Sequence, residues 1–190
     1  MYKRQVQIAA KGETADTVEQ YIAHVPHTLK PDLLAALLKE RGHKRVIVFA
    51  RTRHRADVAC RKLKRAGYHA EAIHSDRSQN QRKRALDNFA SGETDILVAT
   101  DVLARGIDVD EVSYVVNYDV PTQAEDYVHR IGRTGRARKQ GASYLFYTKD
   151  EQKRRVLGHT ERLATASAIA LDHRATYGVA GHEHVVRGTF

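Results

Sequence analysis

The sequence predicts an α/β fold: a doubly wound parallel sheet with helices on both faces. Short apolar runs, typical of strands that are buried on both sides, alternate along the chain with stretches of helical periodicity. The connections between them are short, and glycines or capping residues mark many of the helix ends. Hydrophobic residues make up 42% of the 190 residues, which is enough to build one core of ordinary size.

The first half of the chain contains three strand–helix units. The strands are predicted over 17–26, 46–50 and 70–74, and the helices over 31–42, 54–67 and 78–92. Pro31 stands near the first position of the first helix and Gly42 just past its end, as helix termini favour. Ser78 and Gln81 have the spacing of a capping box at the start of the third helix.

The second half continues the same alternation. Strands are predicted over 95–99, 114–118 and 142–147. Thr122 and Glu125 predict a capping box for the helix between the last two strands, and Thr148 and Glu151 predict another for a final helix that runs to about Leu163. Repeated strand–helix units with short connections are typical of a parallel sheet covered on both faces.

Ligands of such sheets bind at the carboxyl ends of the strands. Polar and charged residues follow the predicted strands there, in the loops after Ala50, His74, Ala99 and Tyr118 and in the segment that leads to Arg136. Three arginines in that segment, Arg130, Arg133 and Arg136, would repel one another along a helix, which indicates a nearby anion.

The charge of the chain suggests what that anion is. The formal net charge is +9 and the pI about 9.7, so we expect a polyanionic partner, although a solvated basic surface would have the same composition. The one cysteine, Cys60, excludes an internal disulfide and favours a reducing compartment, which we take to be the cytoplasm. No apolar run has the length of a membrane span, so no membrane partner is expected.

Both ends of the chain differ from its middle. We treat residues 1–5, MYKRQ, as a candidate non-native scar, and residues 164–190 as a disordered or non-native tail because they show no sustained periodicity. The tail contains His182-Glu183-His184, which we interpret as chance, so no metal site is predicted. The domain is predicted over 6–163.

Four stretches resemble one known family. LVATDVLARGIDV and VVNYDVPTQAEDYVHRIGRTGRA are similar to motifs V and VI of the DEAD-box RNA helicases, VIVFARTR to their motif IV, and HSDRSQNQR to the segment with their Gln-x-x-Arg element. The resemblance covers roughly residues 6 to 160, and it is to the second RecA-like domain of the bacterial type. It implies a RecA-like fold and a part in ATP-driven local unwinding of RNA duplexes.

The resemblance also implies roles for individual residues. Arg133 and Arg136 correspond to arginine fingers that contact the γ-phosphate of ATP, and Asp108 to the carboxylate that binds its ribose. The implied contacts to the RNA backbone are Gln79, Arg82 and Thr100, and the implied interdomain network is Asp101, Arg105, His129 and Arg130. Phe49 corresponds to an aromatic residue that packs beside a motif VI arginine, with a plain core position as the alternative. The family usually has glycine where Ser75 stands, so a positive φ there would strain this chain.

Two motifs of a complete helicase are absent. No glycine is followed by lysine, so the phosphate-binding motif G-x-x-x-x-G-K-[ST] does not occur, and neither does D-E-A-D. ATP and Mg²⁺ are therefore expected to be held mainly by an N-terminal RecA-like domain that this chain lacks, and the chain alone should be inactive. The alternatives are a stand-alone, non-catalytic RNA-binding module and half of a related superfamily 2 DNA helicase.

Overall fold

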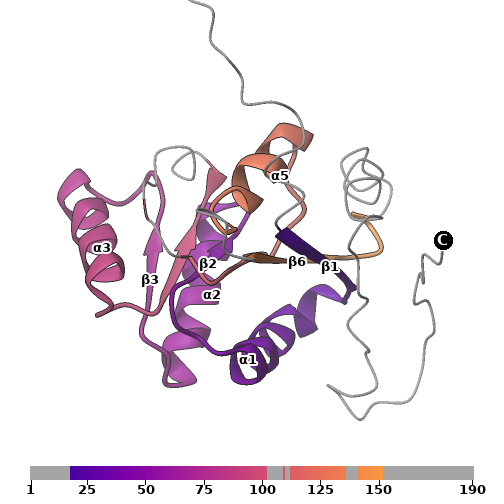
Figure 1. The fold of residues 1–190 in the computed structure, drawn as a ribbon, viewed down its shortest axis with the longest axis horizontal. Coiled ribbons are helices and arrows are strands. Elements are labelled where there is room, and N and C mark those ends of the chain that lie inside the picture. The colour runs from indigo at the N-terminus through magenta and orange to yellow at the C-terminus, as the bar shows by residue number, and fades with distance from the viewer. Residues whose placement is uncertain (1–17, 102–108, 110–111, 136–140, 152–190) are drawn as a thin grey trace, which may run out of the picture.

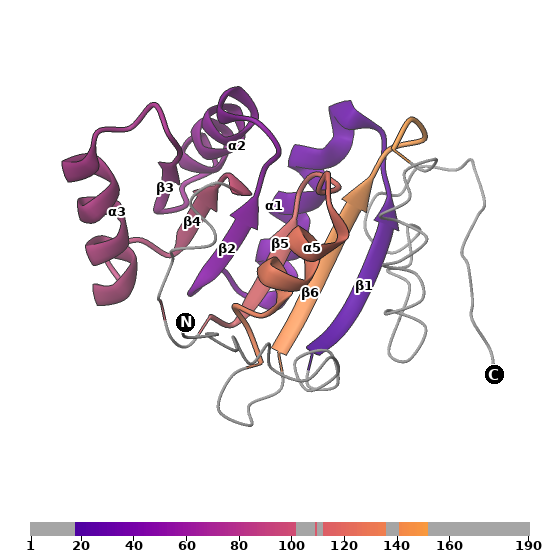
Figure 2. The same ribbon diagram turned by 90° about the horizontal axis from the view of Figure 1, so that it is seen from above.

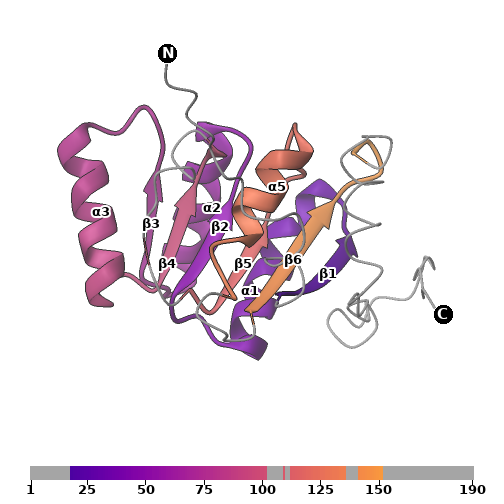
Figure 3. The same ribbon diagram turned by 45° about the horizontal axis from the view of Figure 1, so that its top comes forward.

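A single six-stranded sheet organises the computed structural model, which describes residues 18–101, 109, 112–135 and 141–151. The strands are β1 (Val18–His24), β2 (Val46–Phe49), β3 (Ala70–Ile73), β4 (Ile96–Ala99), β5 (Tyr114–Asn117) and β6 (Gly141–Tyr147). Their order is β1-β6-β5-β2-β4-β3, and every neighbouring pair is parallel; Figure 1 gives the overall arrangement and Figure 3 labels all six strands. The predicted doubly wound parallel sheet is confirmed.

The helices cover both faces of this sheet. They are α1 (Lys30–Arg41), which follows a 3-10 turn over His27–Leu29, α2 (Arg53–Arg65), α3 (Gln79–Ser91) and α5 (Ala124–Ile131). Residues of α1 and α2 pack into one core cluster, whereas α3 and α5 pack into two clusters on the other face (Figures 2 and 3). Strand β2 serves both faces, because Val48 belongs to the first core and Phe49 to the second.

The helix termini test the capping predictions. The capping box at the start of α3 is confirmed, since Ser78 and Gln81 each accept a hydrogen bond from the other's backbone N–H. The box predicted at Thr122 and Glu125 is wrong. Helix α5 begins one residue later, with Gln123 as its N-cap and no side-chain capping bond, and this shift leaves Glu125 one position short of the spacing that a box requires.

The predicted ends of the domain fall outside the described residues. This applies to the scar over 1–5, to the tail over 164–190 and to most of the last predicted helix. At the start of that helix, Glu151 accepts a hydrogen bond from the backbone N–H of Thr148 at 3.1 Å, as the predicted cap requires. No helix in the described part of the chain has the length and hydrophobicity needed to cross a membrane.

Candidate functional site

The carboxyl ends of the parallel strands meet at one edge of the sheet. Three adjacent strands, β5, β2 and β4, present Asp119, Arg51 and Thr100 at this edge just after they end. The amide of Arg51 donates to Asp119 Oδ2 at 3.0 Å, which links two of these loops directly. Polar residues as far apart in the sequence as Arg51 and Asp119 therefore lie along one edge of the sheet.

Arg130 connects the residues at this edge through its hydrogen bonds. Its side chain is completely buried, and two of its nitrogens form a bidentate pair with Asp101, Nε to Oδ1 at 2.6 Å and Nη2 to Oδ2 at 2.8 Å. Its Nη1 donates to Asn117 Oδ1 at 3.1 Å and to the Asp119 carbonyl at 2.9 Å. The guanidinium also lies 5.3 Å from the ring centre of Phe49, the expected aromatic contact. One arginine of α5 thus fixes the ends of β2, β4 and β5.

The other members of the expected interdomain network are placed differently. His129 is exposed on α5, and its side chain forms no hydrogen bond or ion pair with another residue in the described ranges. Arg105 lies outside those ranges. The contacts of Arg130 and Asp101 are made within this domain, and their role toward a second domain stays a prediction.

The segment that follows α5 contains the predicted arginine fingers. Arg133 is partly exposed just beyond the helix end, while Arg136 and Asp108, the predicted ribose ligand, lie outside the described part of the chain. Between the two arginines, Thr134 is buried and its hydroxyl donates to the carbonyl of Val112 at 2.8 Å. Gly135 has φ of 72°, a left-handed conformation that glycine adopts without strain.

Gly141 limits where this segment can lie. A Cβ at this position would come within 2.6 Å of Thr134 Oγ1 and 2.8 Å of Gly135 Cα, closer than side chains pack. We expect Gly141→Ala to displace the segment and to destabilise the domain by about 1–3 kcal/mol. Chemical denaturation would measure this, with Ala142→Ser on the same strand as the control. An unchanged free energy of unfolding would mean that the segment moves aside at no cost.

The expected RNA contacts gather at the β3–β4 side of the sheet. Gln79 is the exposed first residue of α3, and Arg82 follows one turn later with its side chain half-buried. Thr100 directly follows the neighbouring strand β4 and is 6% exposed, and its N–H donates to the Ile73 carbonyl at 3.3 Å. A helix N-terminus beside a strand end suits an anionic backbone, because its free N–H groups bind phosphate.

The turn before α3 is held by a network that the sequence did not reveal. His74 is buried, and its Nε2 lies 3.1 Å from Asp57 Oδ1, which also accepts from Arg77 Nη2 at 2.8 Å. Burial alone would raise the pKa of the Asp57 carboxyl, but the bonds and charges of His74 and Arg77 outweigh it, and the pKa lies below its ordinary value. Among the described non-glycine residues only Arg45 has positive φ, so Ser75 is unstrained.

A second buried network also went unpredicted. Lys30 is fully buried, and its ammonium donates to the carbonyls of Tyr118 and Phe146 at 2.8 and 3.3 Å and pairs with Asp119 and Glu151 at 3.2 and 3.1 Å. This network joins the ends of β5 and β6 to the start of α1. One signal was available: a lysine at a helix N-terminus opposes the helix dipole, so it needs nearby carboxylates.

Comparison with known proteins identifies the family. The family described as "Helicase conserved C-terminal domain" matches residues 29–138, more than half of the chain. The chain belongs to this family. This helicase C-terminal domain is also 47% identical over 141 residues to the ATP-dependent RNA helicase CshA of Listeria monocytogenes. The match covers 74% of this chain and 27% of the relative, so the chain spans about a quarter of the relative's length.

Solved structures place the domain within the DEAD-box type. The C-terminal domain of the DEAD-box protein Dbp5 superposes with a TM-score of 0.74 at 32% identity, over 85% of this chain and 94% of that one. Dbp5 of S. cerevisiae bound to RNA and ADP BeF3 gives a TM-score of 0.73 at 30% identity, over 84% of this chain and 44% of that one. The helicase C-terminal domain described here is therefore RecA-like and of the DEAD-box type, as its motifs predict.

Proposed function

We propose that this domain is the C-terminal half of an ATP-dependent DEAD-box RNA helicase that unwinds short RNA duplexes locally. The observation that carries the proposal is the pair between Arg130 and Asp101. It joins the end of β4, where the RNA candidate Thr100 lies, to α5, the helix that leads to the finger segment. The names of the relatives support the same activity. An N-terminal RecA-like domain would supply the remaining half of the site.

The nucleotide side of the proposed site consists of Arg133, Arg136 and Asp108. A guanidinium stays charged and offers paired donors to phosphate oxygens, so Arg133 and Arg136 would stabilise the charge that develops on the γ-phosphate. Asp108 would accept a hydrogen bond from the ribose. The N-terminal domain would hold most of the ATP and the Mg²⁺, which neutralises charge on the phosphates when bound.

The RNA side consists of Gln79, Arg82 and Thr100. Their placement at a helix N-terminus and a strand end suits contacts to phosphate and sugar, which position a strand without reading its bases. Asp101 follows Thr100 directly and is paired with Arg130 on α5, the helix that leads to Arg133. Through this pair an RNA strand bound at Thr100 would be coupled to the finger segment. Arg105 and His129 would extend this coupling to the N-terminal domain.

Binding of single-stranded RNA by the 190-residue chain tests the RNA side. We expect weak binding with little sequence preference and a steep loss of affinity as salt increases. Arg82→Ala should weaken binding to homopolymers uniformly and reduce the slope of log affinity against log salt by about 1. Fluorescence anisotropy over a salt series would measure both quantities.

The matched control for Arg82→Ala is Arg61→Ala, which removes the same charge from an exposed position of α2. It should leave the salt slope nearly unchanged. A slope that does not respond to Arg82→Ala would contradict the proposed phosphate contact. Equal affinity for RNA and for DNA of the same sequence would favour a DNA-processing role instead.

The proposed helicase works in a reducing compartment, which we take to be the cytoplasm. Its one cysteine, Cys60, is a buried free thiol. Burial raises the pKa of that thiol, so it stays protonated and packs as a small apolar side chain in the core beneath α2.

A further inference from the structure

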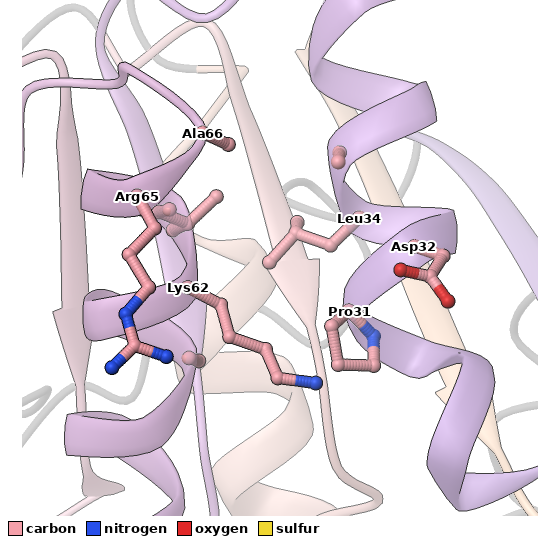
Figure 4. Close-up of a pocket in the computed structure, with 9 residues that line it drawn as sticks. Pro31, Asp32, Leu34, Lys62, Arg65 and Ala66 are labelled. Atoms are coloured by element: carbon pink, nitrogen blue, oxygen red, sulfur yellow. The ribbon is translucent and has the colours of Figure 1, made fainter.

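A pocket opens between α1 and α2, on the face of the sheet that α3 and α5 do not cover (Figure 4). Its volume is about 340 Å³, within the range of ligand pockets. Leu34 and Leu63 are almost fully buried and form part of its wall, together with smaller apolar residues: Pro31, Ala35, Ala59 and Ala66. None of the residues assigned above to RNA or nucleotide lines it.

The charges around the pocket are asymmetric. Lys62 and Arg65 are exposed one turn apart on α2, whereas the carboxylate of Asp32 stands on the α1 side (Figure 4). Within the described ranges, neither Lys62 nor Arg65 forms an ion pair with a carboxylate. The α2 side of the rim therefore attracts anions and the α1 side repels them.

We propose that this pocket binds an acidic segment of a partner protein, with a bulky apolar side chain as its anchor. The anchor would lie between α1 and α2 against Pro31, Ala35 and Ala66, the apolar lining residues that remain accessible. Its flanking carboxylates would pair with Lys62 and Arg65 on the α2 side. Helical peptides that bind in grooves are recognised in the same way: apolar contacts supply affinity, and complementary charges fix the orientation of the peptide. The carboxylate of Asp32 sets that orientation, because it excludes acidic residues from the α1 side.

The composition of the pocket favours a peptide over a nucleic acid. Surfaces that bind single strands combine basic side chains with aromatic rings on which bases stack. None of the nine residues that line this pocket is aromatic, and one of them is an aspartate that would repel phosphate. An aliphatic wall beside one basic rim suits a leucine-like anchor with carboxylates on one flank. The inference does not depend on the proposed helicase function.

Peptide selection with the whole 190-residue chain tests the proposal. A random library of 12-residue peptides is selected on the immobilised protein, and the enriched sequences are synthesised and measured by fluorescence anisotropy. We expect enriched peptides to share a bulky apolar residue followed by Asp or Glu. The double variant Lys62→Glu with Arg65→Glu should weaken their binding at least tenfold, and Ala66→Trp, which covers the pocket from an exposed position, should do the same.

The matched control reverses two charges elsewhere. Lys83 and Arg84 are exposed neighbours on α3, and replacing both by glutamate should change peptide affinity by less than about twofold. Selected peptides without an acidic and apolar pattern, or peptides that bind the Ala66→Trp protein as well as wild type, would overturn the proposal. So would a ten-residue RNA that loses affinity for the Lys62/Arg65 variant while no peptide is selected, since that result would assign the surface to nucleic acid.

Discussion

Replacing Arg133 by alanine is expected to lower ATP turnover by about 10³–10⁵-fold once this chain is joined to the N-terminal domain of a CshA-type relative. Arg133 is partly exposed at the end of α5, on a segment held by the buried Thr134 hydroxyl. A guanidinium in a fixed place can stabilise charge on the transferring phosphate without reorganising at the moment of reaction. Steady-state ATP hydrolysis with saturating RNA would measure the loss.

Two further variants separate the finger role from general effects. Arg133→Lys should also be strongly impaired, because a single ammonium does not reproduce the paired donors of a guanidinium. Arg61→Ala, at an exposed position of α2, should hydrolyse ATP at the wild-type rate. If lysine at position 133 restores most of the turnover, the residue contributes charge alone. If Arg133→Ala stays within twofold of wild type, it is not a finger.

Sequence periodicity predicted most of the fold because the strands are short apolar runs between capped helices. Strands β2, β4 and β5 are buried at every position, as continuous apolar runs indicate. The order of the strands could not be predicted, since the apolar pattern of a strand does not specify which other strands pair with it. The false capping box at Thr122 shows the same limit locally: the spacing fits, but the helix begins one residue later.

The candidate site was predicted where motifs occupy loops and missed where contacts join distant segments. The sequence presents Arg130, Arg133 and Arg136 as one cluster of like charges. In the structure Arg130 is buried against Asp101 inside the domain, and Arg133 is partly exposed beyond the helix end, so the first two arginines of the cluster have separate tasks. Lys30 and Gly141 belong to no sequence motif. Their contacts could not be predicted, because they depend on how the chain folds back on itself.

The second large effect is expected at Lys30. Lys30→Met keeps most of the volume of the side chain but removes the ammonium that pairs with Asp119 and Glu151. Asp119 is fully buried and Glu151 nearly so, and breaking a buried ion pair on one side costs about 3–5 kcal/mol. For a domain of this size the melting temperature should fall by about 10 °C. Calorimetry or circular dichroism during heating would measure the shift.

Lys39 provides the matched control on the same helix. It is exposed in the last turn of α1, so Lys39→Met should change the free energy of unfolding by less than about 0.5 kcal/mol. Arg55 lies 2.7 Å from Asp119 and Arg51 lies 3.5 Å from Glu151, so these arginines could compensate for the lost ammonium. A Lys30→Met protein as stable as wild type would show that they do.

A double-mutant cycle measures the interaction between Lys30 and Glu151 directly, and so separates it from compensation by Arg51 and Arg55. If Lys30 and Glu151 interact as the geometry indicates, Lys30→Met and Glu151→Gln together should destabilise the domain by less than the sum of the single changes, with a coupling of about 0.5–3 kcal/mol. Asp119 gives the coupling a consequence at the site, because its carbonyl accepts a hydrogen bond from Arg130. Lys30 therefore stabilises the end of β5, to which Arg130 is hydrogen-bonded. We expect Lys30→Met to loosen this contact and with it the start of the segment that presents Arg133.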